Sequence, residues 1–353
     1  MAQVHQVLRN ERIRLSLSQE ELAERIGTTP SNVSRWERGI TSPTPYFRRK
    51  LCDLFQLQPE ELFQNTSVPA AVITDDIFQF NTDLRSSGEC YGRVREKMTL
   101  LSRASRGEAT SIIGPRRIGK TWLMKYLKLI APLRLGGQVR VGYLDATTPS
   151  CATMAGFTTE ALKALEIATT AQVRREHESL VALERAVIDL RARNQIPVLC
   201  IDEFEHFCCY DSQRGVMLEH LRAISQAGLG LVVASKRPLT ELVEAAERTS
   251  PFFNICRQIS LHPFSRQEAE SFARDKAAQA GWSEEERDFL LTYAREPERE
   301  VWYPLRLQLV GSLLQEDKML AMQESPHYYR PHQQDYWQEF MERVTEIYQG
   351  AVR

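Results

Sequence analysis

Residues 109–124 read Ala-Thr-Ser-Ile-Ile-Gly-Pro-Arg-Arg-Ile-Gly-Lys-Thr-Trp-Leu-Met, an apolar run followed by a glycine-bounded loop and a helical pattern. The loop fits GxxxxGK[ST] without deviation, and a strand before it and a helix after it are the context that gives this motif its meaning. Gly114 and Gly119 let the backbone curl so that its N–H groups face a phosphate. Lys120 is expected to reach the β- and γ-phosphates, and Thr121 to offer its hydroxyl to Mg²⁺.

The loop and the residue after it are predicted to contact the nucleotide together. These residues are Gly114, Pro115, Arg116, Arg117, Ile118, Gly119, Lys120, Thr121 and Trp122. Lys120 is also assigned a catalytic role, because its charge reaches the phosphates that react. The sequence leaves open whether the two loop arginines meet the nucleotide, a neighbouring subunit or solvent.

A second apolar run ends in adjacent acids at residues 197–207, Pro-Val-Leu-Cys-Ile-Asp-Glu-Phe-Glu-His-Phe. Asp202 stands where an aspartate holds Mg²⁺, usually through water, together with the hydroxyl of Thr121. Glu203 stands where a base polarises the attacking water. Because ligands of α/β sheets bind at the carboxyl ends of the strands, this strand end is expected beside the phosphate loop. We therefore predict both acids as catalytic residues, and Thr121 and Asp202 as the Mg²⁺ ligands.

Five short β-rich runs alternate with helical segments between Cys90 and about Pro263. The runs are residues 109–113, 139–144, 197–201, 229–234 and 257–261. Such alternation is typical of a parallel sheet covered on both faces by helices. From Ser265 onward only helical periodicity remains. The predicted fold is an α/β P-loop NTPase core with a parallel sheet, followed by an α-helical C-terminal lid.

The N-terminal segment is all-α and carries a different signature. Residues 18–39 read SQEELAERIGTTPSNVSRWERG. A capping box opens the first helix, a glycine ends it and a first-turn proline opens the second; the positions are Ser18, Glu21, Gly27 and Pro30. Val33 and Trp36 are spaced to point inward, which leaves polar and cationic side chains outward. Two short helices joined in this way have the geometry of a DNA-reading helix-turn-helix.

This segment, with the later helix PYFRRKLCDLF at residues 45–55, resembles the Cro/repressor-like (XRE) helix-turn-helix family. The resemblance implies binding of double-stranded DNA through Gln19, Thr29, Ser31, Asn32, Arg35 and Arg38. Arg35 suits a guanine edge, whereas Gln19 and Ser31 suit phosphates that set the register. Residues 1–63 hold nine basic and eight acidic side chains, so a single copy is expected to bind DNA weakly and to act as a dimer. The alternative is a helical protein-interaction module.

The block from Tyr91 to about Glu316 resembles the STAND and archaeal-type branch of the AAA+ ATPases. The matching pieces are residues 91–93, 111–124, 198–205, 231–239, 252–269 and 303–314. The resemblance implies ATP as the nucleotide, since the residue chemistry alone does not separate ATP from GTP. It also implies that Tyr91 and Arg93 lie near the adenine and that Pro304, with Arg306 as a weaker candidate, lies near the nucleotide.

The same resemblance implies that a polar residue at the end of residues 229–239 senses the γ-phosphate. Ser235 is the positional match and Arg237 a second candidate, while the alternative is an ordinary strand end before a proline turn. Two features depart from the family. After residue 325 about one helix remains where STAND proteins carry long repeat arrays, and no arginine finger can be named. Hydrolysis is therefore expected to be slow or to need a neighbouring subunit.

Composition limits the remaining classes. The chain has 353 residues, enough for two domains, with 45 basic and 46 acidic side chains, so net charge is no guide to nucleic acid. No apolar run is long enough for a membrane helix, and the charged first residues do not favour export. The cysteines are scattered, at Cys52, Cys90, Cys151, Cys200, Cys208, Cys209 and Cys256. This fits a reducing, cytoplasmic setting without a disulfide framework. Cys208 and Cys209, with His206, lack zinc-site spacing and are interpreted as structural.

The predicted division of the chain follows from these patterns. Residues 1–63 form the helix-turn-helix domain, 64–88 a linker partly laid on the next domain, 89–263 the ATPase core, and 264–353 the helical lid with the C-terminal helices. In the tail, Tyr336, Phe340, Val344 and Ile347 form one apolar stripe. It is expected to pack on the lid, with binding of a partner as the alternative.

Three functions compete on this basis. The first is an ATP-dependent DNA-binding regulator whose nucleotide state controls homo-oligomeric assembly and DNA affinity, with an unidentified protein effector as a further partner. The second is a transposition helper of the Mu type that forms ATP-dependent filaments on DNA. The third is a non-enzymatic repressor whose ATPase fold is a scaffold, and the complete set of Lys120, Thr121, Asp202 and Glu203 argues against it.

Overall fold

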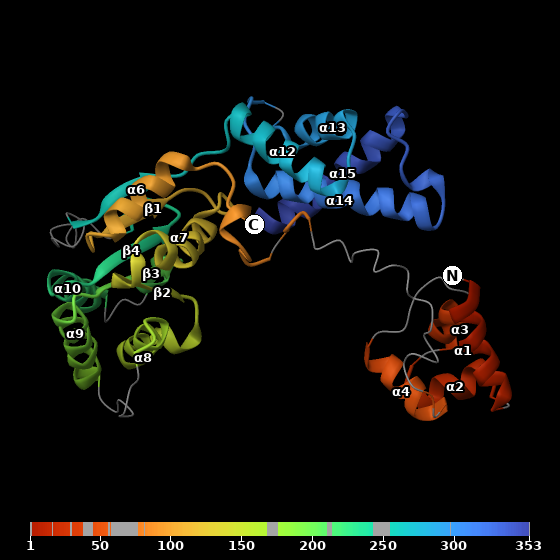
Figure 1. The fold of residues 1–353 in the computed structure, drawn as a ribbon, viewed down its shortest axis with the longest axis horizontal. Helices are drawn as coiled ribbons and strands as arrows, with labels where there is room; N and C mark the ends of the chain where they lie inside the picture. The colour runs from red at the N-terminus through yellow and green to blue at the C-terminus, as the bar shows by residue number, and fades with distance from the viewer. Residues whose placement is uncertain are drawn as a thin grey trace. The chain divides into compact units, whose positions relative to one another are not determined.

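The computed structural model describes residues 2–15, 17–28, 30–37, 45–55, 57, 77–80, 82–167, 176–209, 214–242, 255–296 and 298–352. The chain divides into two compact units, Met1–Asp76 and Ile77–Arg353. They are called the N-terminal unit and the C-terminal unit below (Figure 1). Helices of the described residues lack the combination of length and apolar character that crossing a bilayer requires.

The described part of the N-terminal unit is helical. It contains α1 (Ala2–Arg14), α2 (Gln19–Ile26), α3 (Pro30–Glu37) and α4 (Pro45–Phe55). The predicted boundaries of α2 are confirmed: Ser18 and Glu21 form a reciprocal capping box, and Gly27 ends the helix at φ 75°. Val33 and Trp36 are buried as predicted, against apolar residues of α2 and α4 such as Leu22. The short helices are thus held by a shared apolar core.

The C-terminal unit is built on a five-stranded parallel sheet in the order β2-β3-β4-β1-β5. The strands are β1 (Thr110–Ile113), β2 (Val139–Asp145), β3 (Ile196–Asp202), β4 (Gly230–Ser235) and β5 (Arg257–Ser260). The five predicted strands are confirmed, with ends shifted by a residue or two. The sequence did not give their order: β4 lies between β1 and β3, so the acidic strand is not the direct neighbour of the strand that precedes the loop.

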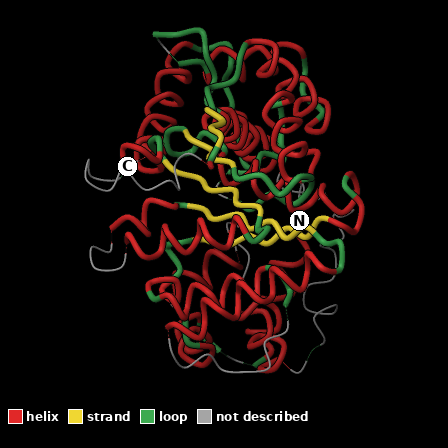
Figure 2. Tube along the Cα trace, turned by 90° about the vertical axis from the view of Figure 1, so that its left-hand side faces the viewer, coloured by secondary structure: helices red, strands yellow, loops and turns green. Residues whose placement is uncertain are grey.

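Helices cover both faces of the sheet, as the continuous apolar character of β3 and β4 requires. On one face α6 (Val94–Ala104) and α7 (Lys120–Arg134) pack on Val198 and Cys200. On the other, α8 (Met154–Ala164), α9 (Glu176–Ala192) and α10 (Arg214–Gln226) surround Leu199 and Ile201. Figure 2 shows the strands in yellow with helices on either side. The α/β class is confirmed.

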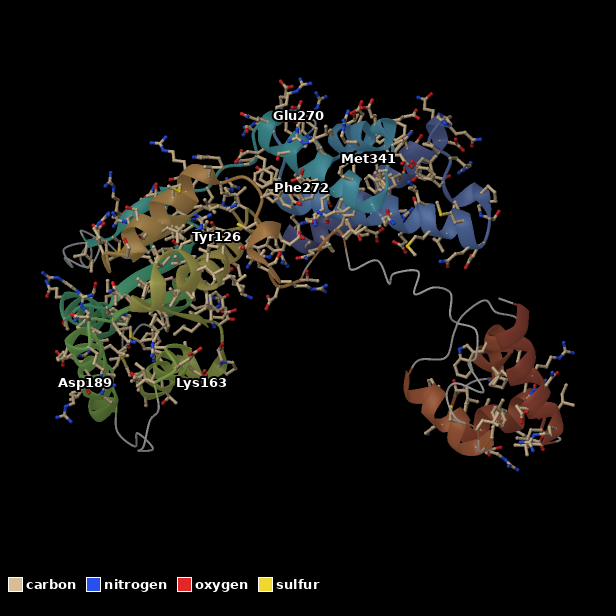
Figure 3. All side chains as sticks on the ribbon, in the orientation of Figure 1. Tyr126, Lys163, Asp189, Glu270, Phe272 and Met341 are labelled. Atoms are coloured by element: carbon tan, nitrogen blue, oxygen red, sulfur yellow. The ribbon has the colours of Figure 1, made fainter. Side chains whose placement is uncertain are left out.

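Four further helices form the helical lid that the sequence predicts. They are α12 (Arg266–Ala280), α13 (Glu284–Ala294), α14 (Pro304–Gln323) and α15 (Gln334–Val352), and Figure 3 labels Phe272 among their side chains. Short 3-10 turns lie at Ser87–Glu89, Gly136–Gln138, Pro149–Ala152, Phe204–Cys209, Leu239–Glu241 and Pro326–Tyr328.

The apolar stripe of α15 packs into the lid core through Tyr336, Phe340 and Val344, as predicted. The expected packing of Ile347 on the lid is wrong, because its side chain is 38% exposed. Tyr348, one residue further along, packs against the core instead. Eleven residues return to within about 20° of the direction of Tyr336, so Ile347 lies on the same helical face, but its side chain stays exposed.

An ion pair ties α13 to α14 within the lid. The Lys318 ammonium lies 2.6 Å from the Glu286 carboxylate, which also accepts a hydrogen bond from the backbone N–H of Ser283. Burial alone raises the pKa of Glu286, but the hydrogen bonds from Lys318 and Ser283 lower it, and the net shift is downward. The charged form of this carboxylate is therefore stabilised by the folded lid.

The sequence predicts that residues 64–88 are a linker partly laid on the next domain, and from Ile77 onward this segment belongs to the C-terminal unit. Phe78 is fully buried in the lid core, with its ring centroid 5.0 Å from that of Trp282. Gly311 of α14 leaves the space for this ring, since a Cβ there would lie 2.1 Å from two ring carbons of Phe78.

Candidate functional site

The phosphate loop joins β1 to α7, which begins at Lys120. Gly119 precedes the helix at φ 101°, a conformation that favours glycine. The Lys120 ammonium donates to the carbonyl oxygens of Gly114, at 2.8 Å, and Pro115, at 3.0 Å. Burial lowers the pKa of Lys120, although the carboxylates of Glu203 and Asp202 counteract it. The loop thus places a buried cation at the start of a helix whose N–H groups favour anions.

The predicted Mg²⁺ ligands are neighbours, although they are far apart in the sequence. The Thr121 hydroxyl donates to Asp202 Oδ2 at 2.6 Å, and the Tyr143 hydroxyl donates to the same oxygen at 3.0 Å. The backbone N–H of Glu203 donates to Asp202 Oδ1 at 3.0 Å. Burial raises the pKa of Asp202, and these three hydrogen bonds lower it only in part. The carboxyl group is therefore held in one orientation. A nearby cation would stabilise its charged form, which burial disfavours.

The donor set fits a magnesium ion. A hydroxyl and a carboxylate, both hard oxygen donors, meet beside a phosphate-binding loop, and Mg²⁺ is usually held by one or two carboxylates plus substrate phosphates. Among the described residues there is no cluster of three or more His, Cys, Asp or Glu side chains that suits an all-protein metal site. Thr121 and Asp202 are the residues that would hold Mg²⁺ with the nucleotide.

Glu203 follows directly at the end of β3, in a left-handed conformation with φ 47°. The left-handed conformation is strained for residues other than glycine and persists only where the surrounding structure holds it. Such residues are frequent at functional sites. Its carboxylate lies 3.5 Å from the ammonium of Lys236, which is also 3.3 Å from the carboxylate of Glu205. Lys236 follows β4, the strand between β1 and β3. The order of the strands therefore brings a lysine to the predicted base, a contact that the sequence does not reveal.

Ser235 ends β4 beside the loop and is fully buried. Its hydroxyl donates to the carbonyl oxygen of Arg237 at 2.7 Å, and its own carbonyl accepts from the N–H of Gly114 at 3.4 Å. Its hydroxyl thus stabilises the turn after β4, and its carbonyl ties that strand end to the loop. Arg237 is exposed.

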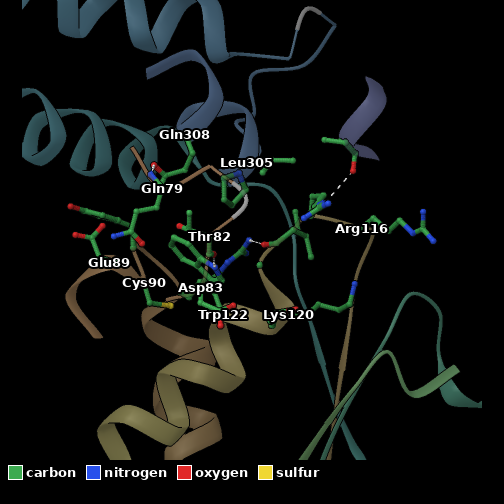
Figure 4. A pocket seen from close by; sticks show the side chains of 18 of the residues that line it. Gln79, Thr82, Asp83, Glu89, Cys90, Arg116, Lys120, Trp122, Leu305 and Gln308 are labelled. Carbon is green, nitrogen blue, oxygen red and sulfur yellow. Dashed lines mark hydrogen bonds between the residues drawn. The ribbon is translucent and has the colours of Figure 1, made fainter. Parts of the chain in front are cut away.

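A cavity of about 520 Å³ opens beside the loop. It is lined by Arg116, Arg117, Ile118, Gly119, Lys120, Thr121, Trp122, Glu203, Tyr91, Arg93 and Pro304 among the predicted residues, and by Gln79, Thr82, Asp83, Glu89, Cys90, Asp145, Thr147, His206, Phe264, Phe272, Leu305, Gln308 and Ala351 besides. Figure 4 shows Gln79 and Gln308 next to each other and Lys120 on the other side of the view. The size is that of a small-molecule site.

Tyr91 and Arg93 join the core to the lid at this cavity. The Arg93 guanidinium donates to the carbonyl oxygen of Ile118 in the loop at 3.1 Å and lies over the ring of Phe264, 5.0 Å from its centroid. The backbone N–H of Arg93 donates to Glu268 of α12 at 2.9 Å. Gly92 permits this approach, because a Cβ there would lie 2.5 Å from a carboxylate oxygen of Glu268. Arg93 is therefore a structural link between loop and lid as well as a lining residue.

The structure shows what Arg117 of the phosphate loop and Arg306 of the lid contact, which the sequence did not decide. The Arg117 guanidinium donates to the carbonyl oxygen of Ala351, near the end of α15, at 3.1 Å. Arg306 does not line the cavity; its guanidinium lies 5.5 Å from the centroid of the Tyr348 ring. Pro304, the other lid candidate, does line it.

Several lining residues and one supporting residue were not predicted. Gln79 and Thr82 lie in the predicted linker, where no periodic signal marks them. Gln308 is one of many polar residues on an apolar helix. Tyr143 supports Asp202 from the neighbouring strand. Its position on the run Val-Arg-Val-Gly-Tyr-Leu-Asp gives no sign of this contact, which depends on the pairing of Tyr143 with Cys200 in the sheet.

The structure describes only some of the residues that are predicted to contact DNA. Thr29 and Arg38 lie outside the described residues, and so do the side chains of Ser31, Asn32 and Arg35, whose backbone belongs to α3. Gln19 is described at the start of α2. Its amide donates to the carboxylate of Glu37 at 2.7 Å.

Glu37 is the acceptor that joins three helices of this unit. Its carboxylate also accepts two hydrogen bonds from the guanidinium of Arg12, at 2.5 and 3.0 Å, and its side chain is only 4% exposed. Gln19, Arg12 and Glu37 thus fix α1 and α2 to the end of α3. Gln19 thus has a structural contact within this unit, and its contact with phosphate stays a prediction.

Two protein-family models match the chain. Residues 8–62 match the family model described as helix-turn-helix, and residues 103–243 match the one described as AAA domain. The chain carries a helix-turn-helix domain and an AAA domain. A comparison with curated proteins gave no match.

Solved structures share the fold of the C-terminal part at low sequence identity. A Walker-type ATPase of Pyrococcus abyssi has a TM-score of 0.56 at 15% identity, over 78% of this chain and 77% of that one. The Aeropyrum pernix ORC2 protein in ADPNP and ADP complexes has a TM-score of 0.53 at 14% identity, over 77% and 71%. The Aeropyrum pernix ORC1 protein in complex with DNA has a TM-score of 0.51 at 14% identity, over 74% and 69%. The predicted AAA+ fold is thereby confirmed.

Proposed function

We propose that the protein is an ATP-dependent DNA-binding switch. ATP bound at the AAA domain changes assembly, and assembly changes how tightly the helix-turn-helix domains hold double-stranded DNA. The meeting of Lys120, Thr121, Asp202 and Glu203 at one end of the sheet supports nucleotide binding and slow hydrolysis. The family matches at residues 8–62 and 103–243 support the pairing of the two activities.

The chemistry assigns one role to each side chain. Lys120 and the loop N–H groups stabilise the charge of the β- and γ-phosphates. Glu203, which lines the cavity, accepts the proton of the attacking water. Mg²⁺, held by Thr121 and Asp202, would neutralise phosphate charge when it is bound with the nucleotide. Lys236 restrains Glu203 by an ion pair, which agrees with slow turnover.

One observation carries the coupling between nucleotide and DNA. The chain that enters the C-terminal unit at Ile77 lines the nucleotide cavity at once, through Gln79 and Thr82. The same segment is tied to the lid, because the Ile77 carbonyl accepts from Lys276 and Phe78 is buried in the lid core. A nucleotide that changes the lid or this wall therefore acts on the chain that leads to the DNA-binding unit.

Assembly compensates for the weak DNA binding expected of a single helix-turn-helix domain. Two helix-turn-helix domains linked through associated AAA domains meet the same DNA at a high effective concentration, so their combined affinity exceeds that of either domain alone. The proposal therefore predicts that nucleotide changes particle size and DNA affinity together.

The test measures DNA binding by fluorescence anisotropy and particle size by sedimentation, on the full chain. The states compared are no nucleotide, ADP and a non-hydrolysable ATP analogue. Lys120→Ala is the test variant, and Lys128→Ala, an exposed lysine on the same helix, is the matched control. The proposal expects a nucleotide response in the wild type and the control that Lys120→Ala lacks.

The pattern of binding separates the competing functions. Saturable binding to a discrete DNA site supports the regulator. Coating of any DNA in proportion to its length supports a filament-forming helper. A nucleotide that changes neither size nor affinity refutes the switch and leaves a repressor with a scaffold AAA fold.

A further inference from the structure

The Tyr143 side chain, which orients the Asp202 carboxylate, has a charged neighbour with no role in the proposed chemistry. The Tyr143 hydroxyl donates to Asp202 Oδ2 at 3.0 Å. The Lys125 ammonium lies over the Tyr143 ring, 5.0 Å from its centroid. A cation within about 6 Å of the centroid is attracted by the electron-rich face of an aromatic ring. The contact therefore restrains the ring that carries the hydroxyl.

Lys125 lies on α7, one turn after Thr121, but it does not line the nucleotide cavity. Its side chain is 18% exposed and forms an ion pair with Asp83. Since Asp83 is largely exposed, this ion pair by itself contributes little stability. Because Lys125 lies outside the cavity wall, a specific effect of this residue on the bound nucleotide has to pass through its contacts.

The ion pair also attaches the chain before the core to the phosphate-loop helix. Asp83 follows Thr82, whose carbonyl oxygen accepts from the indole N–H of Trp122 at 3.2 Å (Figure 4). Trp122 and Lys125 are three residues apart on α7 and so lie on the same side of that helix. A lysine side chain is flexible, and a fixed partner reduces the number of orientations that it samples. Asp83 therefore helps to keep the ammonium over the ring.

We propose that Lys125 is a positioning residue for the magnesium site. By restraining the Tyr143 ring, Lys125 keeps the Tyr143 hydroxyl on Asp202 and so keeps that carboxylate in the orientation that suits Mg²⁺. The inference rests on the proposed function, in which Thr121 and Asp202 hold Mg²⁺ together with the nucleotide. Removing a group that orients a metal ligand typically costs about 10–100-fold in metal affinity. Lys125 is one contact further from the metal, so its effect should be smaller.

The charge of Lys125 by itself predicts the opposite effect. An ammonium group repels a nearby cation, so removing it would strengthen Mg²⁺ binding if charge were its only influence. Loss of the orientation of Asp202 weakens Mg²⁺ binding instead. The direction of the change therefore distinguishes a positioning residue from a nearby positive charge.

The test measures how much Mg²⁺ strengthens nucleotide binding by the full chain. The quantity is the ratio of the ATP dissociation constant in EDTA to that in saturating Mg²⁺. Lys125→Ala is the test variant, and Lys128→Ala, an exposed lysine on the same helix, is the matched control with the same change of charge. Lys125→Ala is also placed in a Tyr143→Phe background, where there is no hydroxyl to position.

In the otherwise wild-type chain, Lys125→Ala is expected to lower this ratio about threefold, the size of a partly exposed cation–π contact, and Lys128→Ala to leave it unchanged. In the Tyr143→Phe background, Lys125→Ala should not lower the ratio further. ATP binding in EDTA is the control for folding.

Two results overturn the positioning role while leaving the proposed function intact. One is a ratio that Lys125→Ala leaves unchanged or raises, and the other is an equal loss with and without the Tyr143 hydroxyl. A wild type whose ATP affinity does not rise with Mg²⁺ refutes the proposed magnesium site and, with it, the positioning role. The two kinds of failure are therefore distinct.

Discussion

The packing of Phe78 against Gly311 allows a direct test of how the lid binds the segment that begins at Ile77. A Cβ at Gly311 would lie 2.1 Å from two carbons of the Phe78 ring. Normal contacts between carbon atoms are about 3.5–4.0 Å, so Gly311→Ala must displace the ring or bend α14. Phe78 has little room to move, because it is fully buried and stacks on Trp282.

The expected size follows from two opposing terms. Alanine in place of glycine inside a helix stabilises by about 1 kcal/mol. Overpacking a core costs about 1–3 kcal/mol, and expelling a phenylalanine from its site costs about 3–5 kcal/mol. We therefore expect Gly311→Ala to lower the free energy of unfolding of the C-terminal unit by about 2 kcal/mol. Gly350→Ala is the matched control: it lies in α15, nothing lies within 4 Å of its added Cβ, and it should be neutral or stabilising.

The assay is urea unfolding followed by tryptophan fluorescence, for which Trp282 beside Phe78 is a native reporter. A second comparison introduces Gly311→Ala into a Phe78→Ala background, where the clash is absent and the cost should disappear. Because Gln79 follows Phe78, Gly311→Ala should also weaken nucleotide binding, while Gly350→Ala should not. The reasoning is refuted if Gly311→Ala is as stable as Gly350→Ala, or if its cost is the same with and without Phe78.

Three further outcomes follow from single contacts. Tyr143→Phe removes a hydrogen bond that orients Asp202 and should weaken Mg²⁺-dependent nucleotide binding about tenfold, measured by titration with Mg²⁺; unchanged affinity contradicts the supporting role. Glu37→Ala removes both hydrogen bonds from the half-buried Arg12 guanidinium, which keeps its bond to the Leu17 carbonyl, and should destabilise the N-terminal unit by about 2 kcal/mol in thermal unfolding; a loss near zero would count against it. Glu286→Gln should cost about 1 kcal/mol at neutral pH. Since folding lowers the pKa of Glu286, its contribution is present above the usual value of 4.5 and is lost as the pH falls through the folded value; a pH-independent cost in urea unfolding argues against the ion pair.

Local features of the fold were predictable because their causes lie close together in the sequence. The capping box of Ser18 and Glu21 and the left-handed Gly27 need only neighbouring residues, and the structure reproduces both. The strands β3 and β4 were the most readily predicted, because their apolar runs are continuous, as strands buried on both faces require. The linker was harder, because it has few periodic apolar positions and the burial of Phe78 depends on a glycine far along the chain.

The sequence by itself determined the phosphate loop, the acidic strand end and the succession of strands and helices, since motif spacing and periodicity are local properties. Only the tertiary structure decided that β4 separates β1 from β3, that Tyr143 and Thr121 share one oxygen of Asp202, and that Lys236 faces Glu203. It also decided that residues just after the inter-unit boundary line the nucleotide cavity. The physical reason is that strand order and side-chain packing bring together residues distant along the chain, and no local pattern encodes which of them will meet.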